Sequence, residues 1–348
     1  MKNPNNYNPR AKALLVAFAT LTIIAATAPA QTTIWQPAGS GDWNVGGNWD
    51  IGVPTAATAQ ARIPQGEAVL SGAGIAQRVM LGIGGTGGTL RLEAGADLDA
   101  TSRLEVGWAG SGAGTFIQNG GTTNANDLRM DSAGSTVTIN DGTFTAAGKS
   151  FLSVGTPTDK TQTISVTGGS FTVQGNLVAS RNGGSGVLEV SGGSVDIQGI
   201  LSREGTLNNK GEFRVIGSAA SSINIGNDIL VDALDTMAFS LDSGGITPIT
   251  VGDEADLPGV GFELDTIAGF SASIGDTFEL LDAGSIVNID ASPTVTNLGG
   301  YSFDVSTVAD GAGTDLIATV TAIPEPTAAG LFAVAGALLL FRRRRFHG

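Results

Sequence analysis

The chain has 348 residues, of which 52 are glycine and none is cysteine, and its formal net charge at pH 7 is −14. The lack of cysteine excludes disulfides, thiolate zinc sites, iron–sulfur clusters and thiol nucleophiles. The single histidine, His347, is the second-last residue, which argues against a Ser-His-Asp triad or a histidine-ligated catalytic metal in a folded core. With 41% hydrophobic residues and a positive mean hydropathy, the sequence predicts a folded protein.

Residues 1–30 are typical of a secretory signal peptide. Three basic residues precede an uncharged apolar run, and the small residues Ala28 and Ala30 stand just before Gln31. We therefore expect an N-terminal signal helix, export by the Sec machinery and cleavage after Ala30. Of the 18 basic residues, 15 remain beyond Ala30, against 32 acidic residues. This excess of acid disfavours nucleic acid or anionic lipid as a partner of the folded part.

Residues 31–88 hold three of the four tryptophans, Trp35, Trp43 and Trp49, among Asp, Asn and Gly. They precede a regular repeat that starts at Thr89. Stacked repeats need their first turn covered, because an open sheet edge polymerises. We interpret the segment as an N-terminal cap with the first turns of the stack. A sugar-stacking platform is the alternative, since indole faces bind apolar sugar surfaces.

Residues 89–234 contain a repeat in which short alternating apolar and polar runs end at glycine. The runs begin 26, 21, 27, 24 and 25 residues apart, at Thr89, Thr115, Thr136, Thr163, Val187 and Glu212. Alternation with period two indicates strands, and a repeat of this length indicates a stacked architecture. We predict an all-β fold, a right-handed parallel β-helix (solenoid) with two or three strands in each of about six turns, spanning about 29 Å. An antiparallel sandwich or barrel is the alternative, because Gly-Gly turns also suit hairpins.

Residues 235–322 lose this repeat but keep alternating strands with Asp- and Gly-rich corners, which predicts an antiparallel β cap. The segment is rich in acidic residues, so a weak calcium site is one interpretation and solvated corner aspartates are the other. We expect no cofactor.

Two patterns are weighed for catalysis. Gly82 to Gly87 matches G-x-G-x-x-G, but a strand rather than a helix is expected to follow it, which argues against a dinucleotide site. The acids of the repeats are few, and Glu93, Glu189 and Asp196 do not recur at consistent offsets. The sequence therefore favours a protein that is not an enzyme.

Residues 323–348 form a three-part tail. Pro324, Glu325 and Pro326 precede an uncharged stretch of 14 residues from Ala328 to Phe341, about 21 Å long as a helix, and a block of four arginines follows. Those arginines, Arg342, Arg343, Arg344 and Arg345, resist translocation and would stay in the cytoplasm. We predict a single transmembrane helix here.

This tail resembles the PEP-CTERM sorting signal of Gram-negative bacteria, and the repeats resemble the autotransporter-associated β-strand type. The resemblance implies that the helix holds the exported protein in the inner membrane. It also implies that an exosortase-type membrane protease recognises Pro324, Glu325 and Pro326 and releases the protein to the cell surface or extracellular matrix. We therefore expect a noncatalytic structural or adhesive protein, with exopolysaccharide as one partner. The alternative is a carbohydrate-binding or polysaccharide-cleaving β-helix module.

Overall fold

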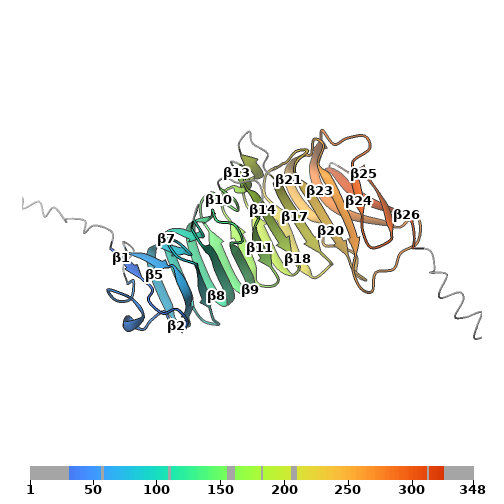
Figure 1. The fold of residues 1–348 in the computed structure, drawn as a ribbon. Coiled ribbons are helices and arrows are strands. Elements are labelled where there is room, and N and C mark those ends of the chain that lie inside the picture. The colour runs from blue at the N-terminus through green and yellow to red at the C-terminus, as the bar shows by residue number, and fades with distance from the viewer. Residues whose placement is uncertain are drawn as a thin grey trace, which may run out of the picture.

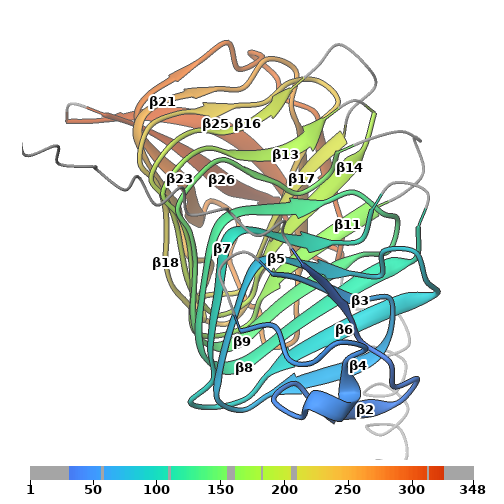
Figure 2. The same ribbon diagram turned by 90° about the vertical axis from the view of Figure 1, so that its left-hand side faces the viewer.

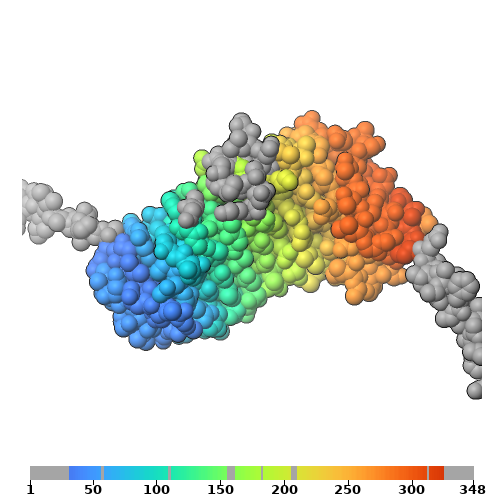
Figure 3. Space-filling model, in the orientation of Figure 1, coloured from blue at the N-terminus to red at the C-terminus, as the bar shows by residue number. Residues whose placement is uncertain are grey.

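The computed structural model describes residues 31–55, 59–108, 111–154, 161–181, 183–204, 210–311 and 313–324. These residues form an all-β parallel solenoid of about nine turns with almost no helix. Figure 1 shows the strands stacked side by side along a rod, with β1 at one end and β26 at the other. The space-filling view in Figure 3 shows the colours following one another in bands, so each stretch of sequence contacts chiefly the turns before and after it.

Three faces surround the interior (Figure 2), and parallel pairing between successive turns builds each of them. Face I contains β1 (Thr32–Ile34), β3 (Gln60–Ile63), β10 (Ser150–Phe151), β13 (Leu177–Arg181), β16 (Leu201–Glu204), β19 (Ile229–Leu230), and the C-terminal parts of β5 (Ala73–Leu81), β7 (Asp97–Val106), β8 (Ala113–Met130), β21 (Ile249–Asp256) and β23 (Thr277–Val287).

Face II carries the repeat that the sequence shows. It contains β2 (Ser40–Asp42), β4 (Gln65–Leu70), β6 (Gly87–Leu92), β11 (Thr161–Val166), β14 (Ser185–Val190), β17 (Lys210–Ile216), β20 (Thr236–Leu241), β22 (Gly261–Thr266), β24 (Val295–Asn297), and the first parts of β8 and β9 (Thr136–Ala146). The predicted register is confirmed: Thr89 pairs with Thr115, which pairs with Thr136, and the series continues to Glu212.

Face III completes each turn. It contains β12 (Ser170–Val173), β15 (Gly193–Ile197), β18 (Ala220–Ile225), the N-terminal parts of β5, β7, β21 and β23, and middle or later parts of β8 and β9. A full turn therefore uses three strands, in agreement with the expectation of two or three.

The core consists of inward side chains stacked in ladders from turn to turn. One ladder on face II reads Leu70, Leu92, Gln118, Ile139, Val166, Val190 and Val215, all fully buried. Phe144 lies between Phe116 and Phe171, with ring centroids 5.7 Å and 5.5 Å away. Burial of such side chains is the main stabilising contribution in a chain without disulfides.

The corner between faces II and III requires glycine. Gly121, Gly142, Gly169 and Gly193 stack there with φ of +71°, +83°, +63° and +64°. A Cβ on Gly142 would lie 2.3 Å from the carbonyl oxygen of Gly121 on the turn before. Both the backbone conformation and the close approach of the turns thus exclude other residues.

The N-terminal end is closed by the tryptophan segment, which includes a short 3-10 helix (Gly46–Asn48). Trp35, Trp43 and Trp49 are buried, and their rings meet edge to face at centroid distances of 5.1 Å and 4.9 Å. The Nε1 atom of Trp49 donates to the Trp43 carbonyl at 2.8 Å. Buried rings cover the first turn and cannot stack on a sugar, so these three tryptophans serve as a cap.

The C-terminal segment corrects two expectations. The stack does not end near residue 234, and there are more than six turns, because β20, β22 and β24 continue the parallel pairing of face II. Among the strands of the described residues, antiparallel pairing joins only β23, β26 (Gly313–Ala322) and β25 (Ser302–Asp310). The repeat was hidden because the corner chemistry changes. At Asp242 a carboxylate accepts the backbone N–H groups of Ser218 and Gly244, at 3.0 Å and 2.7 Å, and the glycine with positive φ follows only at Gly245, with φ of +97°.

Candidate functional site: the basic strip of face I

Face I carries one basic side chain in each of seven successive layers of the described chain. These residues, which we call the basic strip, are Arg62, Arg78, Arg103, Arg129, Lys149, Arg181 and Arg203. They lie in β3, β5, β7, β8, β13 and β16, and Lys149 immediately precedes β10. Their side chains emerge from the outer surface because the inward positions of these strands hold the apolar ladder.

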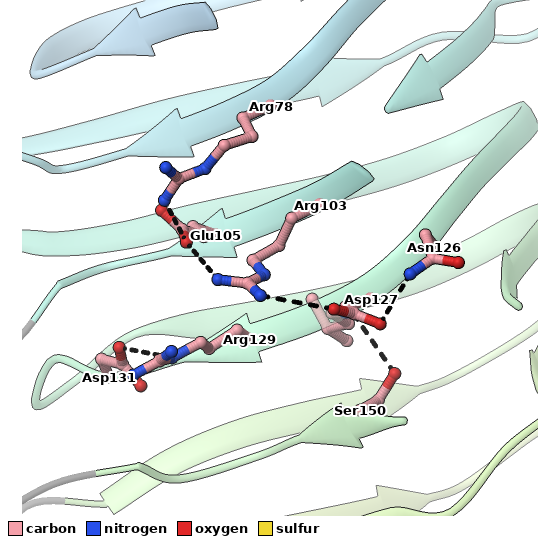
Figure 4. A network of polar contacts seen from close by, with 9 residues as sticks. Arg78, Arg103, Glu105, Asn126, Asp127, Arg129, Asp131 and Ser150 are labelled. Atoms are coloured by element: carbon pink, nitrogen blue, oxygen red, sulfur yellow. Dashed lines mark hydrogen bonds and ion pairs between the residues drawn. The ribbon is translucent and has the colours of Figure 1, made fainter. Parts of the chain in front are cut away.

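A chain of ion pairs joins the first turns of the strip (Figure 4). The Oε1 atom of Glu105 lies 2.5 Å from Nη2 of Arg78 and 3.1 Å from Nη1 of Arg103. Nη2 of Arg103 then reaches Oδ2 of Asp127 at 3.4 Å. The Glu105 side chain is fully buried, although the two guanidinium groups keep about a quarter of their surface in solvent. Glu105 is thus a shielded counter-ion that holds two stacked arginines together.

Arg129 stands at the next layer and bridges an acid and an aromatic ring. Its Nε atom lies 2.8 Å from Oδ2 of Asp131, whose side chain is 2% exposed. Burial raises the pKa of Asp131, and the ion pair with Arg129 opposes that rise. The guanidinium carbon of Arg129 also lies 5.3 Å from the centroid of Trp108, a ring that is 37% exposed. The result is an accessible indole fixed by a cation.

A second aromatic ring is held in the same way. The ammonium of Lys149 and the guanidinium of Arg181 lie 5.4 Å and 5.3 Å from the centroid of Phe151. Both cations pair with Glu204, and the Arg181 Nε to Glu204 Oε2 distance is 3.6 Å. Lys149 and Arg181 remain 40% and 42% exposed. The middle of the strip therefore presents two aromatic rings among partly exposed cations.

The strip ends beside a buried carboxyl. Arg203 pairs with Asp232, and its Nε atom is 3.9 Å from Oδ2 of Asp235. Asp235 is 3% exposed and accepts the backbone N–H groups of Gly211, at 2.7 Å, and Asp232, at 2.9 Å. Burial raises the pKa of Asp235 to about 6, while the hydrogen bond from Gly211 and the charge of Arg203 oppose the rise. A small apolar hollow lined by Leu201, Phe213 and Met237, among others, adjoins this carboxyl.

The chemistry available on face I is recognition by charge and ring stacking. Each carboxylate of the network is turned toward an arginine or lysine. Within the described residues, no group of three or more His, Asp or Glu side chains is placed to hold a metal ion. Guanidinium groups are bidentate donors to carboxylates and phosphates, and exposed aromatic faces stack on flat apolar surfaces.

The sorting residues predicted from the sequence are mostly not described. Pro324 is exposed and follows β26 at the end of the solenoid. The remaining predicted positions, Ala28, Ala30, Glu325, Pro326, Arg342, Arg343, Arg344 and Arg345, lie outside the described residues. Across the described part of the chain, no helix is long and apolar enough to cross a membrane. The predicted G-x-G-x-x-G segment is a turn followed by β6 (Gly87–Leu92), in agreement with the argument against a dinucleotide site.

Sequence reasoning missed the basic strip. The repeat was read through its apolar residues and glycines, whereas the strip residues sit in the third, shortest strand of each turn. Their spacing follows the repeat only once the turns are aligned: Arg78 pairs directly with Arg103, and Arg103 with Asp127. A count of basic residues in the face I segment of each aligned turn would have found the strip.

Comparison with protein-family models gives no match for this chain. A search of the curated proteins finds no match either.

Proposed function

We propose that this chain is an exported surface protein with a structural or adhesive role in the cell envelope or extracellular matrix. In this proposal the solenoid is a noncatalytic rod, and a C-terminal tail directs its sorting. In this proposal residues 1–30 are a Sec signal helix, the coil is right-handed, and residues 323–348 hold the rod in the inner membrane of a Gram-negative bacterium until an exosortase-type protease acts.

The observation that carries the proposal is the place of the last described strand in the rod. This strand, β26, lies at the end of the rod opposite β1 (Figure 1) and ends at Ala322, two residues before Pro324. Pro324 is exposed. A tail that leaves the end of a rod would present the Pro-Glu-Pro motif to a membrane protease without unfolding any turn. It would also leave every face of the rod free for contacts in the matrix.

The ion pairing of the carboxylates on face I supports a binding role over a catalytic one. Glu105 and Asp131 are buried and ion-paired with arginine. Glycoside hydrolysis instead needs two carboxyl groups that flank an accessible bond. The exposed Trp108 and the half-buried Phe151 are aromatic rings on the outer surface, and they favour a carbohydrate-binding module over a polysaccharide-cleaving one.

The experiment follows export and processing in the native host. Mass spectrometry of the mature protein should find the N-terminus at Gln31 and a tail cleaved close to Pro324. Protease added to intact cells should degrade the rod. Glu325→Ala should leave the protein uncleaved in the inner membrane, whereas Asp290→Ala, at an exposed acid of the rod, should be processed normally. Full-length protein in the cytosol, or unaltered processing of Glu325→Ala, would refute the proposal.

A further inference from the structure

The charges of this protein are divided very unevenly between its surfaces. From Val215 to Pro324 there are 16 acidic residues and no basic one. Of the basic residues that the structure describes, only Arg91, Lys210 and Arg214 lie off face I. Six acids accompany the seven bases of the strip, namely Glu105, Asp127, Asp131, Glu204, Asp232 and Asp235, so the strip is close to neutral on an otherwise acidic rod.

Folding alone does not call for this arrangement. Like charges directly opposite one another in a sheet are destabilising. Arg78 nevertheless pairs in register with Arg103, and a buried glutamate is needed between them. The outward positions of face II that repeat as threonine, such as Thr115, Thr136 and Thr163, show that neutral side chains serve equally well in this coil. The repetition of a cation over seven layers therefore points to a ligand that runs along the rod.

The spacing of the strip defines the shape of that ligand. The cations form a staggered band: Arg78 and Arg103 share one position along the strands, whereas Arg62 and Arg129 are in register with Glu105, two residues further on. Strands of neighbouring turns lie about 4.8 Å apart, so this band presents one cation per layer over about 29 Å. This distance between charges is comparable to one sugar unit of an extended polysaccharide. A linear polymer with a carboxylate on its sugar units could place one acid opposite each layer, where guanidinium groups bind carboxylates in bidentate fashion.

The two aromatic rings distinguish a sugar polymer from a bare polyanion. Trp108 and Phe151 belong to the middle of the strip, on either side of Arg129, which pairs in register with Phe151. Each ring is fixed by strip cations at 5.3–5.4 Å, so each offers an apolar patch bordered by positive charge. A uronic acid ring has the matching pair of features, an apolar C–H face and a carboxylate at its edge.

We propose that face I binds an acidic polysaccharide along the rod axis. Strip cations pair with its uronate carboxylates, and Trp108 and Phe151 stack on its sugar rings. This inference rests on the proposed adhesive function and names the class of polymer that the rod would hold. Single-stranded nucleic acid is the competing polyanion, and the binding test compares the two polymers directly.

The test measures binding of the purified full-length protein to immobilised polygalacturonate by biolayer interferometry. A neutral β-linked glucan and single-stranded DNA with the same number of charges serve as comparison polymers. We expect binding to polygalacturonate that weakens as sodium chloride rises from 50 to 500 mM, because exposed ion pairs are screened. The neutral glucan should bind far more weakly. No binding to polygalacturonate at low salt, or tighter binding to DNA, would overturn the proposal.

Matched variants locate the site. Arg181→Gln, at a side chain that is 42% exposed, should lower the affinity about threefold to tenfold. Arg214→Gln is the control, because Arg214 is 38% exposed and also pairs with two carboxylates, but it lies on face II. Trp108→Ala should also weaken binding, whereas Leu230→Ala should not, since Leu230 is 38% exposed on face I beyond the last strip cation. Equal losses in Arg181→Gln and Arg214→Gln would refute the assignment.

Failure of this inference can be told apart from failure of the proposed function. The binding assay uses purified protein and does not depend on export or on the tail. If the protein reaches the cell surface but does not bind polygalacturonate, polysaccharide binding by face I is refuted and the proposed surface function is not.

Discussion

The buried pair of Gln118 and Thr123 offers a direct test of how the apolar ladders stabilise the coil. Gln118 occupies the ladder position between Leu92 and Ile139 and is fully buried. The Thr123 hydroxyl, also fully buried, donates to Oε1 of Gln118 at 2.9 Å. The amide Nε2 of Gln118 donates to the carbonyl of Gly121 at 3.2 Å. One turn of the core therefore holds a small polar network where its neighbours hold aliphatic side chains.

Removing one partner should cost more than removing both. Thr123→Val keeps the shape of the side chain but leaves Oε1 of Gln118 without its donor, a loss of about 1–3 kcal/mol. Gln118→Leu likewise strands the Thr123 hydroxyl. In the double variant both groups are gone and the ladder becomes continuous, so we expect stability within about 1 kcal/mol of the parent protein, or above it. The coupling energy between the two sites should then be about 1–3 kcal/mol.

The measurement is a double-mutant cycle by urea unfolding, followed by far-ultraviolet circular dichroism. Because stacked repeats can lose cooperativity, hydrogen exchange of the β8 amides should be recorded for the same four proteins. Thr138→Val is the control and should change stability little, because Thr138 faces outward on β9, in register with Ile117 of the turn before. Additive losses in the double variant would show that Gln118 and Thr123 act independently and would refute the argument.

Three further predictions concern the coil. Gly142→Ala should destabilise the fold by more than the ~1–2 kcal/mol that a left-handed alanine costs, because its Cβ would lie 2.3 Å from a backbone atom. Gly275→Ala, where φ is +94° but the surrounding space is open, should cost only this conformational strain. Thermal unfolding compares the two variants. Phe144→Ala should cost about 3–5 kcal/mol in urea unfolding, since the ring is fully buried between aromatic rings of the preceding and following turns, and a loss below 1 kcal/mol would contradict that packing. Burial raises the pKa of Asp235 in the folded state to about 6, above its ordinary value of 3.8. The stabilising contribution of Asp235 is therefore complete below about pH 4 and is lost as the pH rises through 6, by about 3 kcal/mol in all. Asp235→Asn should remove this part of the pH dependence of unfolding, and identical profiles for the two proteins would refute it.

The part of the fold that the sequence revealed is the part with a strict local rule. Alternating apolar residues must face inward, and a corner with positive φ requires glycine, so the register from Thr89 to Glu212 could be read directly. The corner changes at Asp242, whose carboxylate accepts backbone N–H groups, and the glycine with positive φ follows only at Gly245. The coil continues there with the same ladders, but the pattern used to detect it is gone.

The candidate site was hidden for a different reason. Whether Arg78 and Arg103 are neighbours depends on the length of the turn between them, and that turn is 25 residues long, whereas β3 and β5 are offset by only 18. Variable turn length scatters the strip along the chain without moving it on the surface. The burial of Glu105 could not be foreseen either, because a glutamate in an outward position is ordinarily solvated.

Stability and binding make opposite demands on face I. A fully neutralised strip would favour folding, whereas a polyanion needs uncompensated cations. The structure separates these demands along the rod: Glu105 is buried and shared by Arg78 and Arg103, while Lys149 and Arg181, the most exposed of the strip cations in ion pairs, share the exposed Glu204. Coulombic attraction is screened at the exposed pairs and much less at the buried one. Glu105→Gln should therefore lower chiefly the stability of the fold. Glu204→Gln should instead release Lys149 and Arg181 from their shared ion pair and strengthen the binding of an acidic polymer.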